Sequence, residues 1–192
     1  MIKMKAVFGQ AVTSLAAVAL MVGASGCALD AQEEAGESAE VVDSQEQAVT
    51  NNRKIALQNY STSRCLDGNA AGSVYTSGCY WDTYQVWIPR KVNAADTGFQ
   101  LINSKTGRCL DSNTSGKVYT LPCNNGRFQQ WEFKKSATLP AGAERGRWVN
   151  TATQLVLDSN TGGSVYTGGN NNGNFQKWNT TPCISGVLCL DI

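Results

Sequence analysis

The sequence predicts an all-β domain of about twelve strands, built from three copies of one unit. Three observations support this prediction in the 192-residue chain. A repeat covers most of the chain, each copy alternates short β-prone runs with Gly, Asn, Ser and Asp turns, and no copy has a helical hydrophobic period. One unit of four short strands has too small a core to fold alone, so the three are expected to pack together in a closed arrangement that leaves no sheet edge exposed.

The first 26 residues have the pattern of a signal peptide. Lys3 and Lys5 precede a mostly apolar run that ends in small residues just before Cys27. Those small residues resemble a bacterial lipobox, with Ala24 where that motif favours leucine. The chain is therefore expected to be exported, either with lipid attached at Cys27 or with an ordinary signal peptide cut nearby. Cysteine parity favours lipidation, because Cys27 is the odd one of seven cysteines.

Residues 27–52 are predicted to be a disordered acidic linker, or a propeptide that is later removed. After Cys27 this stretch has no basic or aromatic residue and no sustained apolar period, so it cannot bury enough surface to fold. From residue 53 onward the chain carries a modest basic excess spread along its length. Nucleic-acid binding would need clustered basic residues, so it is not expected.

The repeat lies in residues 53–182. Its units span about residues 53–91, 97–135 and 146–182. In each unit an Asp is followed by Asn two residues later, by Tyr after eight and by Trp after twenty, without a gap. Each Trp ends a Gln-x-Trp motif, and three such alignments in one register do not arise by chance. Residues 183–192 follow the last unit and are predicted to be a C-terminal tail.

Three units of this kind, each with a Leu-Asp motif and a terminal Gln-x-Trp, resemble the ricin B-chain-like (R-type, QxW) β-trefoil lectins and carbohydrate-binding modules. The resemblance implies a β-trefoil domain without a cofactor. It also implies up to three shallow sugar sites, one per unit, that bind galactose-type or related glycans multivalently. One such site is expected to have a Kd on the order of 0.1–1 mM, which avidity would improve.

Four cysteines recur at two equivalent positions in the first two units. Cys65 and Cys79 match Cys109 and Cys123, and the third unit lacks both. The absence of both cysteines from the third unit is expected if the two positions pair within a unit, as Cys65–Cys79 and Cys109–Cys123. Each bridge would close a loop of about 15 residues and stabilise the fold by about 3 kcal/mol.

The last two cysteines lie in the tail. Cys183 and Cys189 would form a small terminal loop if they pair with each other. Metal binding is the alternative for the cysteines. No histidine and no C-x₂-C spacing support a metal site, so none is expected.

The tryptophan that ends each unit is predicted to be a core residue, because it recurs at fixed spacing. A buried indole N–H would need a hydrogen-bond acceptor. The tryptophans are Trp87, Trp131 and Trp178. The apolar positions expected to join them are Leu66, Leu110, Leu157, Val74, Val118 and Val165.

Three aspartates recur directly after an apolar strand, where Asp is unusual. They are Asp67, Asp111 and Asp158. Each either caps a turn formed with the asparagine two residues later, or accepts hydrogen bonds from two sugar hydroxyls. The asparagines are Asn69, Asn113 and Asn160. The resemblance implies sugar binding, with the aspartate oriented by the glutamine of Gln-x-Trp. These glutamines are Gln85, Gln129 and Gln176.

The recurring tyrosines are Tyr75, Tyr119 and Tyr166. Each either packs within its strand or stacks on the apolar face of a sugar ring. In R-type lectins a strand aromatic stacks from a position two residues nearer the second cysteine. That position holds Ser77, Leu121 and Gly168. The stacking surface is therefore expected to come from the tyrosine or to be lost.

The loop before each Gln-x-Trp differs most among the units, so it is expected to carry specificity. Asn125 and Asn172 are predicted polar contacts there, and the first unit has Trp81 instead.

The predicted function is carbohydrate binding without catalysis. Glycoside hydrolysis needs two carboxyl groups roughly 5–10 Å apart, whereas each unit repeats only one aspartate. A protein-binding β-trefoil, an inhibitor or adhesin with vestigial sugar sites, is the alternative. The expected partner is a glycan or polysaccharide, and membrane contact is expected only through lipid at Cys27. The protein is predicted to be secreted or to be a cell-envelope lipoprotein.

Overall fold

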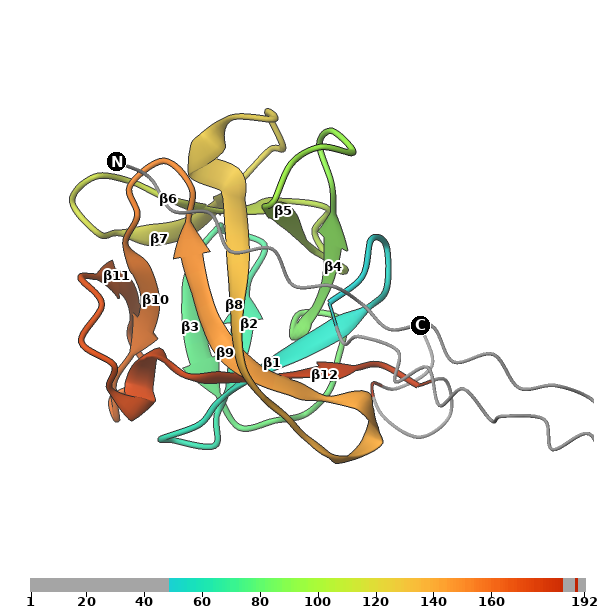
Figure 1. The fold of residues 1–192 in the computed structure, drawn as a ribbon, viewed down its shortest axis with the longest axis vertical. Helices are drawn as coiled ribbons and strands as arrows, with labels where there is room; N and C mark the ends of the chain where they lie inside the picture. Colours follow the sequence, from blue (N-terminus) through green and yellow to red (C-terminus); the bar gives the residue numbers. More distant parts are fainter. Residues whose placement is uncertain (1–48, 185–188, 190–192) are drawn as a thin grey trace, which may run out of the picture. The chain divides into compact units, whose positions relative to one another are not determined.

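The computed structural model describes residues 49–184 and residue 189 (Figure 1). The predicted signal peptide, Cys27 and the linker up to residue 48 lie outside these residues. Each unit supplies four strands. The first gives β1 (Ile55–Asn59), β2 (Cys65–Gly68), β3 (Val74–Ser77) and β4 (Val86–Arg90). The second gives β5 (Phe99–Asn103), β6 (Cys109–Ser112), β7 (Val118–Leu121) and β8 (Gln130–Thr138). The third gives β9 (Glu144–Asn150), β10 (Val156–Ser159), β11 (Val165–Gly168) and β12 (Trp178–Pro182).

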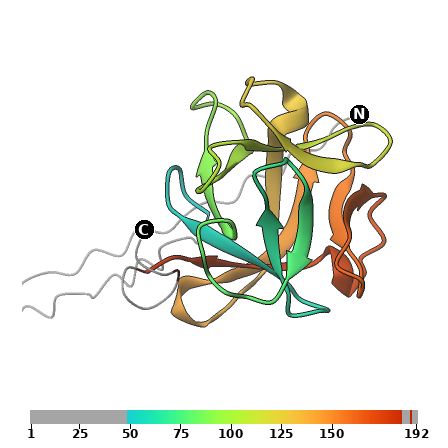
Figure 2. The same ribbon diagram turned by 180° about the vertical axis from the view of Figure 1, so that it is seen from behind.

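Six of the strands close into a barrel. Strands β1, β4, β5, β8, β9 and β12 pair antiparallel in that order, and β12 pairs with β1. The remaining strands form the hairpins β2–β3, β6–β7 and β10–β11 (Figures 1 and 2). This is the β-trefoil that the repeat predicts. No helix in the described part of the chain is long and apolar enough to cross a membrane.

The three hairpins hold one another in a ring of backbone hydrogen bonds. In the second strand of each hairpin (β3, β7 and β11), a threonine amide donates to a glycine carbonyl in a neighbouring hairpin. The bonds are Thr120 N to Gly72 O at 2.9 Å, Thr167 N to Gly116 O at 2.8 Å and Thr76 N to Gly163 O at 2.8 Å. The glycines have φ of 79° to 90°, and a Cβ at Gly116 would lie 2.5 Å from the Thr167 carbonyl oxygen. Glycine recurs here because the chain turns left-handed against a neighbouring backbone.

The predicted core is confirmed. The three repeated tryptophans and leucines are fully buried, Val118 and Val165 are buried, and Val74 is half-buried against the same cluster. Each indole N–H donates to the carbonyl of the leucine in its own unit. The donor–acceptor distances are 3.1 Å for Trp87 to Leu66, 2.9 Å for Trp131 to Leu110 and 3.0 Å for Trp178 to Leu157.

Three buried asparagines join the units to one another. Each accepts hydrogen bonds from its own turn and donates its Nδ2 to a backbone carbonyl of the neighbouring unit at 2.7 Å. The pairs are Asn59 with Phe175, Asn103 with Tyr84, and Asn150 with Phe128. These bonds lock each loop that precedes a Gln-x-Trp to the next unit.

The three predicted disulfides are present. Their Cα–Cα distances are 5.0 Å for Cys65–Cys79, 5.1 Å for Cys109–Cys123 and 5.3 Å for Cys183–Cys189.

The start of the domain needs a correction. Residues 49–52, which the sequence assigns to the linker, pack against β4. Val49 is buried in the core cluster, the Asn52 amide donates to Pro89 O at 2.6 Å, and Asn51 Oδ1 accepts from the Lys91 amide at 2.9 Å. One apolar side chain and two hydrogen bonds anchor these residues, although the surrounding composition is that of a linker.

Candidate functional site

Each unit places its aspartate directly opposite its tyrosine in an antiparallel hairpin. Residues that face each other across such a pair project from the same face. The pairs are Asp67 with Tyr75, Asp111 with Tyr119, and Asp158 with Tyr166. The carboxylates are 4–7% exposed, while Tyr75 and Tyr166 are 36% and 38% exposed. Each unit therefore has a buried carboxylate opposite a phenol ring, which is exposed in the first and third units and half-buried in the second.

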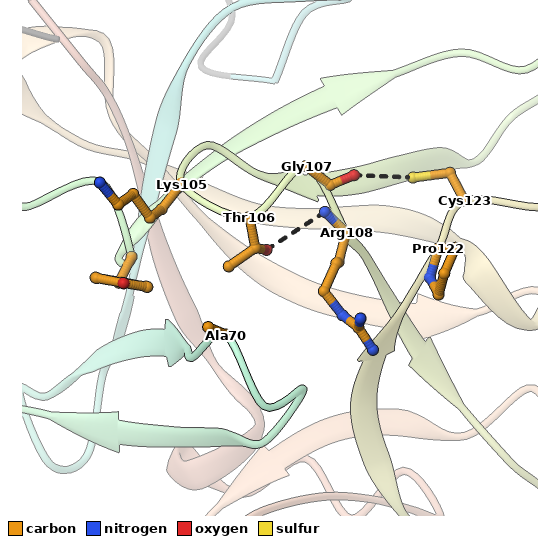
Figure 3. A pocket seen from close by; sticks show the side chains of 8 residues that line it. Ala70, Lys105, Thr106, Gly107, Arg108, Pro122 and Cys123 are labelled. Carbon is orange, nitrogen blue, oxygen red and sulfur yellow. Dashed lines mark hydrogen bonds between the residues drawn. The ribbon is translucent and has the colours of Figure 1, made fainter.

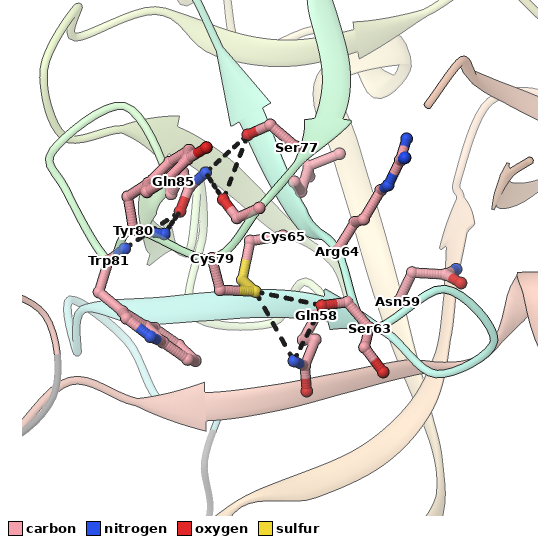
Figure 4. Close-up of a disulfide and its surroundings, with 12 residues drawn as sticks. Gln58, Asn59, Ser63, Arg64, Cys65, Ser77, Cys79, Tyr80, Trp81 and Gln85 are labelled. Atoms are coloured by element: carbon pink, nitrogen blue, oxygen red, sulfur yellow. Dashed lines mark hydrogen bonds between the residues drawn. A yellow bond between two sulfur atoms is a disulfide. The ribbon is translucent and has the colours of Figure 1, made fainter. Parts of the chain in front are cut away.

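A fully buried glutamine positions each of these sites, as the first unit shows (Figure 4). Gln85 Oε1 accepts from the amides of Tyr80 and Trp81 at 2.8 and 3.1 Å. Its Nε2 donates to Gly78 O at 2.7 Å and to Asp67 Oδ2 at 3.2 Å. One side chain thus fixes both the loop and the carboxylate.

The other two units repeat this arrangement. Gln129 accepts from the Asn124 amide at 2.9 Å and donates to Asp111 Oδ2 at 3.0 Å. Gln176 accepts from the Asn171 amide at 3.0 Å and donates to Gly169 O at 2.8 Å. The glutamines predicted at the sugar site are positioning residues here, because none of them reaches the surface.

The asparagines that follow the aspartates form the hairpin turns. The side-chain oxygen of each accepts a backbone amide hydrogen at 3.0–3.1 Å. The amides belong to Ser73 for Asn69, Lys117 for Asn113 and Ser164 for Asn160. The turn role that the sequence offered to the aspartate thus belongs to the asparagine.

Two of the aspartates lie in hollows lined by aromatic residues. The first-unit hollow has a volume of about 530 Å³, and its lining includes Asp67, Asn69, Tyr75, Ser77, Tyr80, Asp82 and Tyr84. The second-unit hollow has a volume of about 230 Å³ and is lined by Asp111, Ser112, Asn113, Tyr119, Asn124, Gly126 and Phe128. Each hollow therefore has aromatic residues besides its strand tyrosine: Tyr80 and Tyr84 in the first unit, and Phe128 in the second.

The second aromatic stands immediately before the glutamine of Gln-x-Trp. It is Tyr84 in the first unit, Phe128 in the second and Phe175 in the third. Phe128 is 43% exposed. This position could have been found from the sequence, since all three units have an aromatic residue immediately before the glutamine.

The residues predicted as loop contacts share one backbone conformation. Trp81, Asn125 and Asn172 all have φ of 56° to 59°, so the loop turns left-handed at this residue. Asn125 does not line the second-unit hollow, whereas its neighbour Asn124 does. Asn172 accepts a hydrogen bond from Arg147, and Trp81 packs with Val86 and Cys183 in a separate apolar cluster.

Burial sets the electrostatics of the site. It raises the pKa of Asp111, an effect that the Gln129 hydrogen bond opposes, and it raises the pKa of Asp158 in the same way. Burial and then the charge of the opposing aspartate raise the pKa of each tyrosine. The phenols therefore stay protonated at neutral pH and can donate hydrogen bonds.

The three sites differ at the position two residues beyond the tyrosine. In the first unit, Ser77 Oγ donates to Asp67 Oδ2 at 3.1 Å. Leu121 and Gly168 have no group that could do this. In the third unit, Asp158 Oδ1 is buried and has no hydrogen-bond partner among the described residues. Within that same part of the chain, no cluster of three or more Cys, Asp or Glu residues could hold a metal ion.

No protein-family model matches the chain, and no curated protein matches its sequence. Solved structures do match. A designed threefold-symmetric protein, ThreeFoil, has a TM-score of 0.55 at 23% identity, covering 67% of this chain and 97% of its own. An exo-β-1,3-galactanase from Clostridium thermocellum has a TM-score of 0.59 at 17% identity, covering 70% of this chain and 31% of its own. SeviL, in complex with asialo-GM1 saccharide, has a TM-score of 0.57 at 14% identity, covering 70% and 100%. At these identities the likeness establishes a shared fold.

Proposed function

We propose that this chain is a non-catalytic carbohydrate-binding protein with one shallow sugar site on each unit. One observation carries the proposal: in all three units a buried carboxylate lies opposite a tyrosine that is exposed or half-buried. A carboxylate accepts hydrogen bonds from adjacent sugar hydroxyls, and an aromatic ring packs on the apolar face of the sugar ring.

The second unit gives the simplest example of such a site. Asp111 supplies the acceptor, while Tyr119 and Phe128 supply two aromatic surfaces. Asn113 and Asn124 add amide groups at the rim. At about 230 Å³ the hollow is smaller than the pockets that hold drug-sized ligands, which favours one sugar residue per site.

Galactose-type glycans are the proposed ligands. The comparisons support this choice, because the solved structures with this fold include a galactanase and a protein in complex with the asialo-GM1 saccharide. The chain matches only 31% of the galactanase, so the activity of that enzyme is not assigned to it.

The absence of catalysis is part of the proposal. The repeated feature is a single carboxylate per site, whereas hydrolysis requires two acting on one bond. Asp82 adds a second carboxylate in the first unit, but its Oδ1 accepts the Tyr84 amide hydrogen at 3.0 Å. The other units have Gly126 and Gly173 at that position, so a catalytic pair is not a property of the repeat.

The proposed setting is outside the cytoplasm. Three disulfides in the described residues favour an oxidising compartment. The N-terminal pattern favours export and a lipid anchor at Cys27. A surface-anchored chain with three weak sites would bind multivalent glycans more tightly than free sugars, because the sites act together.

A glycan array probed with the full chain tests the proposal. We expect signal on glycans that end in galactose-type sugars, stronger at high glycan density and reduced by free sugar. Silence on every glycan at both densities would contradict carbohydrate binding and would favour a protein partner.

A further inference from the structure

A basic hollow lies where the first and second units meet. It has a volume of about 590 Å³ and is lined by Ala70 and Tyr84 from the first unit and by Lys105, Thr106, Gly107, Arg108, Pro122 and Cys123 from the second. Figure 3 shows Lys105 and Arg108 on either side of Thr106, with Ala70 across from them. The sugar sites described above do not include these two basic residues.

This hollow adjoins the first-unit sugar hollow, because Ala70 and Tyr84 line both. Both units fix the position of Tyr84. Its carbonyl accepts from the Gly68 amide at 3.2 Å and from Asn103 Nδ2 at 2.7 Å. A ligand longer than one sugar can therefore extend past Tyr84 from one hollow into the next.

The two basic side chains retain donors for a ligand. Arg108 donates from Nε and Nη2 to the hydroxyl and carbonyl of Thr120, at 3.3 and 2.7 Å, and no described residue accepts a hydrogen bond from its Nη1. The ammonium group of Lys105 lies 6.0 Å from the centre of the Tyr84 ring. Neither residue forms an ion pair with a carboxylate in the described part of the chain.

The repeat shows that this basic pair is specific to one boundary. The first unit has Ser61 and Arg64 at the equivalent positions, and the third has Ala152 and Leu155. The threefold fold therefore does not require Lys105 or the pair. Asp67 and Asp82 make the adjoining sugar hollow acidic, so the two neighbouring hollows carry opposite charge.

We infer that the Lys105–Arg108 hollow is a second subsite that binds an anionic group, a sulfate ester or a carboxylate, on a glycan whose neighbouring sugar occupies the Asp67 hollow. This inference rests on the proposed sugar site of the first unit. Arginine and lysine donors match the oxygens of such anions. The acidic hollow repels the anion, and this polarity fixes the direction in which the glycan lies.

Titration of the full chain with three disaccharides tests the inference. The probes are lactose, lactose sulfated on its galactose, and glucuronic acid linked to galactose. We expect at least one acidic probe to bind about 3- to 10-fold more tightly than lactose in low salt, with the advantage shrinking at 0.5 M salt. The two acidic probes distinguish a sulfate site from a carboxylate site.

Lys105→Ala installs the residue that the third unit carries, so it is expected to preserve the fold. It should remove most of the acidic advantage while leaving lactose binding unchanged. Lys134→Ala, which removes the same charge from the β8–β9 hairpin, should leave the advantage intact. In the Asp67→Asn background, Lys105→Ala should no longer change the binding of the acidic probes. The neighbouring sugar is then no longer anchored, so the anion is not held beside Lys105.

The outcomes separate the two proposals. Equal binding of all three probes, or an acidic advantage that Lys105→Ala leaves in place, overturns the anionic subsite. Lactose binding in the same titration still supports the proposed sugar binding. Binding of acidic probes that depends on Lys105 but persists in Asp67→Asn overturns the link between the hollows. Binding of none of the probes overturns the subsite, and only a silent glycan array would extend that failure to sugar binding as a whole.

Discussion

The inner and outer parts of this β-trefoil follow different rules. In the interior, all three units use the same residues for the same contact: a buried tryptophan bonded to a leucine carbonyl, and an asparagine bonded to the next unit. On the outer face, the hollows measure about 530 Å³ in one unit and 230 Å³ in another. Identical residues therefore maintain the fold, and the residues that differ give the units hollows of different size and lining.

The largest effect is expected from the interior. Trp131→Ala should lower the free energy of unfolding by about 3–5 kcal/mol, because it opens a cavity in the shared core and leaves the Leu110 carbonyl without its donor. Tyr119→Ala on the outer face should cost less than about 1 kcal/mol and should weaken only sugar binding. Urea denaturation of both variants measures the contrast, and similar losses would show that the two regions are not distinct.

Removing a disulfide is also expected to lower the free energy of unfolding, but by less than Trp131→Ala does. Replacing Cys109 and Cys123 together with alanine should lower the free energy of unfolding by about 3 kcal/mol. The reverse experiment uses the third unit, where Val156 and Asn170 hold the equivalent positions. Val156→Cys with Asn170→Cys should form a bridge and raise stability by roughly 1–3 kcal/mol, as thermal unfolding under oxidising and reducing conditions will show. Failure of that pair to bridge would contradict the equivalence of the units.

Gln129 joins the two regions, so its removal should affect both. Gln129→Ala leaves the Pro122 carbonyl and the Asn124 amide without their partner and releases Asp111. We expect a loss of about 1–3 kcal/mol in stability together with loss of sugar binding at the second unit. Denaturation and sugar titration of the same sample test this. Normal binding would show that Asp111 does not need the glutamine.

The sequence predicted the interior better than the outer face. Recurring Trp, Leu and Asp residues revealed the fold, because burial imposes the same residue at each copy. The sequence was less informative for the loops: Asn125 itself has a left-handed backbone, and its neighbour Asn124 lines the hollow instead. The aromatic before each glutamine was visible in the repeat, but only the structure shows that Tyr84 and Phe128 line sites.

The smallest effect concerns pH. Burial raises the pKa of Asp111 above its ordinary 3.8 in the folded state. The folded state therefore holds this proton more tightly than the unfolded state, and stability falls as pH rises from 3.8 through the raised pKa, then levels off. Asp111→Asn should remove this fall and change stability near neutral pH by less than about 1 kcal/mol. Urea denaturation from pH 3 to 7 compares the two proteins, and a stability difference that does not vary with pH would contradict the role of burial.

Sugar binding by the protein with all three carboxylates neutralised tests the central claim most directly. The variant combines Asp67→Asn, Asp111→Asn and Asp158→Asn, which keep side-chain shape and remove the acceptor charge. Titration with the best glycan from the array should give no measurable binding, while urea denaturation shows a cooperative fold of near wild-type stability. Undiminished binding by the folded triple variant would contradict the assignment of the three aspartates as the sugar acceptors.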